Sequence, residues 1–73
     1  MERLVLTAPD ISCDHCINAI GRAVGALEGA RMVEGNPDTK QVIVEFDLSK
    51  TGLDAIKEAM AEEGYEVAAA VPA

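Results

Sequence analysis

The chain has 73 residues, of which 49% are apolar, and its formal net charge is −7 at pH 7. This length leaves room for one domain with a modest core, so we expect a single domain over residues 1–73 with its folded part at about 3–69. The small size argues against an enzyme with a large substrate pocket, and the acidic balance suits neither nucleic acid nor an anionic membrane surface.

The first half of the chain predicts a strand, a loop and a helix. Apolar side chains alternate along residues 3–8, which is the period of a strand, and Pro9-Asp10 ends that pattern. From Cys16 to Leu27 the apolar residues recur at helical spacing. Gly29 stands where a glycine would cap the C-terminus of this helix.

A β-hairpin is predicted next. Residues 30–35 form a weak strand pattern, and residues 41–46 form the clearest strand in the chain. The turn residues 36–39 separate them by a short connection. The two strands should therefore pair with each other.

The last third predicts a helix followed by a strand. Thr51 is placed as the N-cap, with Asp54 three residues later in an arrangement close to a capping box. Gly64 ends the helix, residues 65–69 form the last strand, and residues 71–73 are expected to be a frayed tail. The element order βαββαβ builds an α+β ferredoxin-like sandwich, a four-stranded antiparallel sheet with both helices on one face.

The most informative motif is the pair Cys13 and Cys16, the only cysteines of the chain. They lie where the loop enters the first helix, and the free N–H groups of a helix N-terminus favour the thiolate form. No apolar run approaches the ~18–20 residues that span a bilayer, and residues 1–6 lack a secretory signal. We therefore expect a cytoplasmic protein without direct membrane insertion, in which such a pair is a metal or redox site.

Thiolate sulfur selects soft ions such as Cu(I), whereas structural zinc normally takes four ligands. Met32 and Met60 lie on apolar patterns, so we expect them to pack in the core and not to bind metal. His15 adjoins Cys16 in sequence and should point away from an ion held between the cysteines. An exposed side chain, an influence on the thiols, and a third ligand in a metal-bridged homodimer all remain open for it.

The C-x-x-C loop between a strand and a helix, the βαββαβ order and the pair Gly64-Tyr65 together resemble the heavy-metal-associated domain family, in its stand-alone bacterial copper chaperone type. The resemblance covers about residues 3–69. It implies that Cys13 and Cys16 bind Cu(I), and that the ion passes to the metal-binding domain of a copper-transporting P-type ATPase. It also implies that Tyr65 lies near the metal.

Two neighbours of the cysteines bear on which metal is bound. Members of the family that prefer zinc, cadmium or lead often carry an acidic residue directly before the first cysteine, where this chain has Ser12, which favours copper. Asp14 keeps a hard oxygen ligand within reach. Zn(II), Cd(II) and Hg(II) therefore stay open as alternatives, as does thiol–disulfide redox chemistry.

Overall fold

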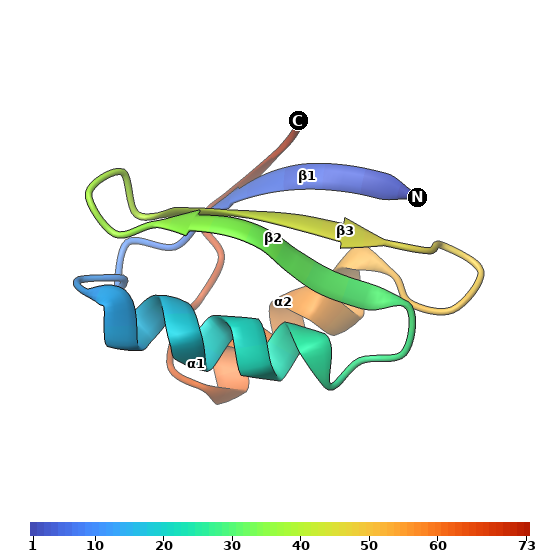
Figure 1. The fold of residues 1–73 in the computed structure, drawn as a ribbon, viewed down its shortest axis with the longest axis horizontal. Coiled ribbons are helices and arrows are strands. Elements are labelled where there is room, and N and C mark those ends of the chain that lie inside the picture. Colours follow the sequence, from blue (N-terminus) through green and yellow to red (C-terminus); the bar gives the residue numbers. More distant parts are fainter.

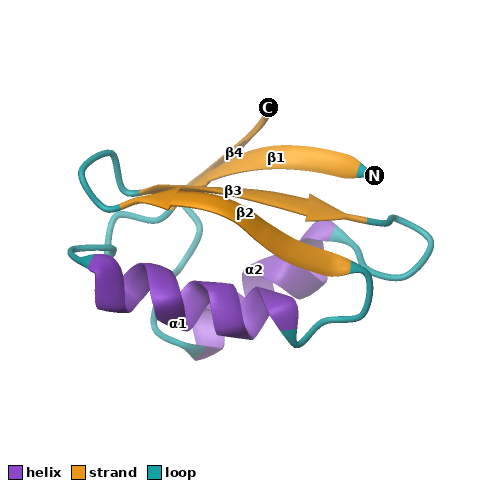
Figure 2. Ribbon diagram, viewed as in Figure 1, coloured by secondary structure: helices purple, strands orange, loops and turns teal.

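The computed structural model describes residues 1–73 as a four-stranded sheet with two helices beneath one of its faces (Figures 1 and 2). The elements in chain order are β1 (Glu2–Thr7), α1 (Asp14–Gly25), β2 (Ala30–Asn36), β3 (Gln41–Phe46), α2 (Leu53–Glu62) and β4 (Ala69–Pro72). The strand order is β2-β3-β1-β4, and every neighbouring pair is antiparallel. The predicted ferredoxin-like sandwich is confirmed. No helix is both long enough and apolar enough to cross a bilayer.

The core lies between the sheet and the helices. Alternate side chains of the two central strands face the helices because successive residues of a strand point to opposite faces. They meet the apolar stripes of α1 and α2. The largest fully or almost fully buried side chains are Leu6, Ile11, Ile20, Val24, Val42, Val44, Phe46, Ile56 and Met60. Met60 is therefore a core residue as expected, and the half-buried Met32 packs against the same cluster.

The first helix is shorter than its apolar pattern predicts. It ends at Gly25, with Ala26 as C-cap, and Leu27 lies in the following turn, where its N–H donates to the Val24 carbonyl at 3.0 Å. Leu27 still packs against the core, so its apolar side chain indicates contact with the core and not a helical residue. Gly29 is not the helix cap. It lies in the turn that leads into β2, where it adopts a left-handed backbone with φ +77°.

Thr51 is not the N-cap of α2, which is Gly52 without any side-chain cap. The Thr51 hydroxyl instead donates to the Glu28 carbonyl at 2.5 Å, and the side chain is buried. This hydrogen bond joins the chain before α2 to the turn after α1. The local capping pattern fails because the Thr51 hydroxyl bonds to the carbonyl of a residue 23 positions earlier in the chain.

The last strand begins later than predicted and includes the segment expected to fray. Strand β4 pairs with β1 from Leu4↔Pro72 to Thr7↔Ala69, and the Ala73 N–H donates to the Arg3 carbonyl at 3.1 Å. Residues 65–68 are a connection whose apolar members, Tyr65 and Val67, pack against the core. These residues are therefore apolar because they cover the core, and not because they pair in the sheet.

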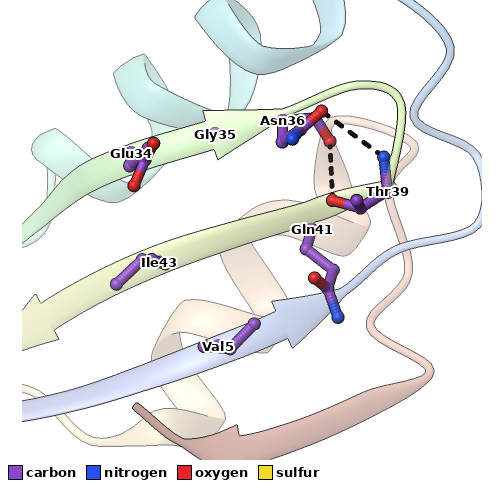
Figure 3. A pocket seen from close by; sticks show the side chains of 7 residues that line it. All are labelled: Val5, Glu34, Gly35, Asn36, Thr39, Gln41 and Ile43. Carbon is purple, nitrogen blue, oxygen red and sulfur yellow. Dashed lines mark hydrogen bonds between the residues drawn. The ribbon is translucent and has the colours of Figure 1, made fainter.

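The predicted turn between β2 and β3 is organised by Asn36. Its side-chain carbonyl accepts the N–H of Asp38 at 2.9 Å. The same oxygen accepts the N–H of Thr39 at 3.4 Å, and the Thr39 hydroxyl donates to the Asn36 backbone carbonyl at 3.4 Å (Figure 3). Lys40 completes the turn in the left-handed region at φ +59°. These bonds give the turn a defined shape before it enters β3.

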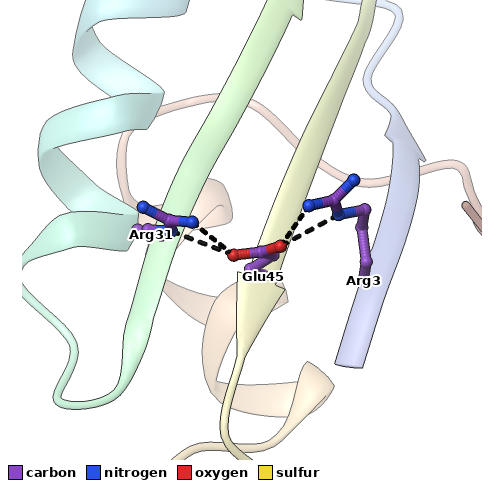
Figure 4. Close-up of polar contacts among 3 residues, drawn as sticks. All are labelled: Arg3, Arg31 and Glu45. Carbon is purple, nitrogen blue, oxygen red and sulfur yellow. Dashed lines mark hydrogen bonds and ion pairs between the residues drawn. The ribbon is translucent and has the colours of Figure 1, made fainter. Parts of the chain in front are cut away.

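The face of the sheet away from the helices carries an ion triad. Glu45 on β3 accepts two hydrogen bonds from Arg31 on β2, at 3.0 and 2.7 Å, and two from Arg3 on β1 (Figure 4). The two guanidinium groups hold the pKa of Glu45 below its usual range, Arg3 having the larger effect. The triad links three neighbouring strands across the open face.

Replacing Thr51 by valine should lower the free energy of unfolding by about 0.5–1.5 kcal/mol, because the variant keeps the shape of the side chain and removes its hydrogen bond to the Glu28 carbonyl. Chemical denaturation measures the difference. The matched control is Thr39→Val, since the Thr39 hydroxyl lies at the surface and its hydrogen bond is long. Equal stability losses in the two variants would contradict the importance of the Thr51–Glu28 bond.

Glu45→Gln should lower the melting temperature at neutral pH, because it removes the carboxylate that both arginines share. A lowered pKa in the folded state stabilises the fold above the unfolded pKa of the carboxyl, and this contribution is lost as the pH falls through the folded value. The melting temperatures of wild type and variant should therefore converge in acid. A constant difference at every pH would count against the triad as its source.

Candidate metal centre

The two cysteines lie at the junction between the loop after β1 and helix α1. Cys13 is the N-cap residue of α1, with an extended backbone at φ −161° and ψ 177°, and Cys16 lies in the first helical turn. The Cys13 carbonyl accepts the N–H of Cys16 at 3.1 Å and that of Ile17 at 3.4 Å. The placement predicted from the sequence is confirmed, and the two sulfur atoms lie 3.9 Å apart.

The two thiols differ in exposure. Cys13 is exposed, whereas Cys16 is only 8% accessible and belongs to the core cluster. One sulfur is therefore held by packing and the other faces solvent. An incoming group can approach the pair from the Cys13 side without opening the core.

The surroundings of Cys16 lower the pKa of its thiol. Hydrogen bonding from the Tyr65 hydroxyl, and next from the backbone and side chain of Ser12, lowers the pKa of the Cys16 thiol to about 6 against the opposing effect of burial. Ser12 Oγ lies 3.7 Å from Cys16 Sγ. The same contact with Cys16 raises the pKa of Tyr65. These contacts favour the thiolate form of Cys16, which is the form that binds metal and attacks disulfides.

The fold brings some of the predicted neighbours to the pair and not others. Ser12 and Tyr65 both lie close enough to Cys16 to act on its thiol. His15 and Asp14 are exposed in the first turn of α1. No group of three or more histidine, cysteine, aspartate or glutamate side chains comes together.

One residue near the site was missed by sequence reasoning. The Lys40 ammonium group, from the β2–β3 turn, donates to the Ile11 carbonyl at 2.5 Å, two residues before Cys13. A lysine in a turn normally indicates only a solvated surface. The one available signal was topological, because an antiparallel β1–β3 pair brings the start of β3 beside the end of β1.

Comparison with known proteins agrees with this architecture. The family model described as "Heavy-metal-associated domain" matches residues 5–66. A COP-associated protein of Helicobacter pylori strain J99 is 38% identical over 65 residues, covering 89% of this chain and 97% of the relative. The copper chaperone CopZ of Bacillus subtilis is 37% identical over 68 residues, covering 93% of this chain and 99% of the relative.

The solved structures include a close match in shape. A structure described as "CopZ metallochaperone" superposes with a TM-score of 0.83 at 30% identity and covers 89% of this chain and 97% of that chain. The similarity thus spans nearly all of the sequence and the whole arrangement of strands and helices. The chain belongs to the heavy-metal-associated domain family.

Proposed function

We propose that this protein is a cytoplasmic, non-enzymatic metallochaperone that carries Cu(I) between Cys13 and Cys16. The observation that carries the proposal is the 3.9 Å separation of the two sulfur atoms. Metal–thiolate bonds are about 2.3 Å long for zinc, so two sulfurs at this separation can both contact one ion. The names of the relatives, which include copper chaperones, point the same way.

Copper is the preferred cargo because the donors are two soft sulfurs without a third protein ligand. Zinc in structural sites takes four ligands, and Zn(II) or Cd(II) bound here would need further ligands from solvent or another molecule. Hg(II) shares the preference of Cu(I) for a pair of thiolates. The absence of an acidic side chain immediately before Cys13, where Ser12 stands, also favours copper.

Release would proceed by ligand exchange. A thiolate of the acceptor attacks the bound ion from the exposed side of Cys13, and a three-coordinate species bridges the two proteins. One cysteine of this chain then leaves, so the ion is never free in solution. The acceptor we propose is the metal-binding domain of a copper-transporting P-type ATPase, and the net charge of −7 favours an acceptor with a basic surface.

A thiol–disulfide protein is the second candidate, favoured by the same close pair and by the low pKa of Cys16. Its distinguishing property would be a reduction potential in the range of dithiol enzymes together with disulfide reductase activity. A carrier of Cu(I) needs neither.

Cys13→Ser and Cys16→Ser should each abolish high-affinity Cu(I) binding, because a single thiolate cannot hold the ion between two sulfurs. Anaerobic titration of the reduced protein against a chromophoric Cu(I) chelator, with zinc in parallel, measures this. The wild type should bind about one copper per chain, with much weaker binding of zinc.

His15→Ala is the matched control, since His15 is exposed beside Cys16 and joins no metal cluster. Its affinity as a monomer should equal that of the wild type, and sedimentation of the copper-loaded proteins tests whether it contributes to a metal-bridged dimer. Full affinity in both cysteine variants would refute the ligand assignment.

Tyr65→Phe should raise the pKa of Cys16 from about 6 towards the value of an ordinary thiol, because it removes the largest interaction that favours the thiolate. The shift is measured by following thiolate absorbance against pH in a Cys13→Ser background, where Cys16 is the only thiol. The fraction of thiolate at slightly acidic pH should fall in the phenylalanine variant. An unchanged titration midpoint would show that the hydroxyl has no such influence.

A further inference from the structure

We propose that Lys40 is a positioning residue for the metal site, acting through the loop of residues 8–13 that carries Cys13. We call these residues the metal loop. The inference rests on the proposed function, since it concerns how the loop presents a ligand to Cu(I). It adds a role for a residue on the β2–β3 turn, far from the cysteines in the sequence.

Lys40 is bonded to the metal loop at both ends of the loop's first turn. The Ala8 N–H donates to the Lys40 backbone carbonyl at 2.9 Å, and the Lys40 ammonium donates to the Ile11 carbonyl at 2.5 Å. Between them, the Ile11 N–H donates to the Ala8 carbonyl at 3.0 Å. One residue therefore closes a ring of hydrogen bonds around the turn that precedes Cys13.

The turn that carries Lys40 is itself well defined. Asn36 and Thr39 are joined by the hydrogen bonds drawn in Figure 3, and Gln41 Nε2 donates to the Thr7 hydroxyl at 3.4 Å. Lys40 adopts a left-handed backbone, which is uncommon for a residue with a side chain. The Lys40 side chain therefore starts from a constrained turn. It reaches across to the metal loop, where its ammonium bonds to the Ile11 carbonyl.

The need for such a tether follows from the different supports of the two cysteines. Cys16 is held by the helix and the core, whereas Cys13 is exposed and follows the loop. The Ile11 side chain is buried in the core, and the Ile11 carbonyl accepts a hydrogen bond from the Lys40 ammonium. Loss of this charge-assisted bond would free the segment between Ile11 and Cys13, so the Cys13 sulfur would spend less time at bonding distance from an ion shared with Cys16.

The test compares Lys40→Met, which keeps the length of the side chain and removes the ammonium, with Lys40→Arg, which keeps the cation and its donors. Lys57→Met is the control for the change in net charge, since Lys57 is an exposed residue of α2. For each protein we would measure unfolding of the metal-free form, Cu(I) affinity by chelator competition, and the rate of Cu(I) loss to the chelator. All binding is measured where every variant is fully folded.

Lys40→Met should weaken Cu(I) binding about tenfold, mainly through faster dissociation, as for residues that orient a metal ligand from outside the coordination sphere. Lys40→Arg should restore most of the affinity, and Lys57→Met should match the wild type. In metal-free protein, the Ile11 amide, whose N–H donates to the Ala8 carbonyl within this turn, should exchange hydrogen faster in Lys40→Met than in the Lys57→Met control.

Unchanged affinity and amide exchange in Lys40→Met would overturn the inference, and so would a loss of folding stability with affinity kept. An equal loss of affinity in Lys40→Arg would also overturn it. If the wild-type protein binds no Cu(I), the proposed function fails, while the amide exchange of the metal-free variants still decides whether Lys40 restrains the loop.

Discussion

The extended backbone of Cys13, immediately before α1, is the constraint on which the rest of the site depends. With φ at −161° and ψ at 177°, the residue lies outside the helix while its carbonyl already accepts the N–H of Cys16. The first helical turn therefore sets the relation between the two side chains, and the sulfurs come within 3.9 Å of each other. The same junction places both sulfurs near the free N–H groups that favour negative charge at a helix N-terminus.

Packing in the core maintains this geometry because the turn that carries Cys16 is part of the core. Cys16 and Ile17 are both buried, and Ile17 packs directly on the backbone of β2 at Gly35. A Cβ atom on Gly35 would lie 2.5 Å from Ile17 Cγ2, so only glycine permits this approach of strand and helix. A register shift between Met32 and Glu34 lies just before this contact in β2. The position of α1 against the sheet, and hence of Cys16, is thus set by packing.

Much of this could be predicted from the sequence because it depends on local patterns. Strand β3 begins and ends as its alternation indicates, and the C-x-x-C spacing placed both cysteines correctly at the loop–helix junction. The errors arose where a distant partner decided the outcome. The Thr51 hydroxyl donates to the Glu28 carbonyl and does not cap the helix that follows it. The apolar residues directly after Gly64 pack against the core, and the chain pairs with β1 only after them. No local pattern could show that Lys40 bonds to Ile11, since that contact exists only once β1 and β3 are paired.

For the metal carrier that we propose, this arrangement would meet two opposing demands. Tight binding requires both sulfurs to be held at the right separation, whereas transfer requires one of them to be reachable by another molecule. Cys16 meets the first demand through burial and through the Tyr65 and Ser12 contacts that favour its thiolate. Cys13 meets the second, since its side chain lies at the surface while the loop behind it is anchored by the buried Ile11. Because the stabilising contacts act on the backbone of the loop and on the buried thiol, the exposed sulfur would remain available for ligand exchange in the proposed function.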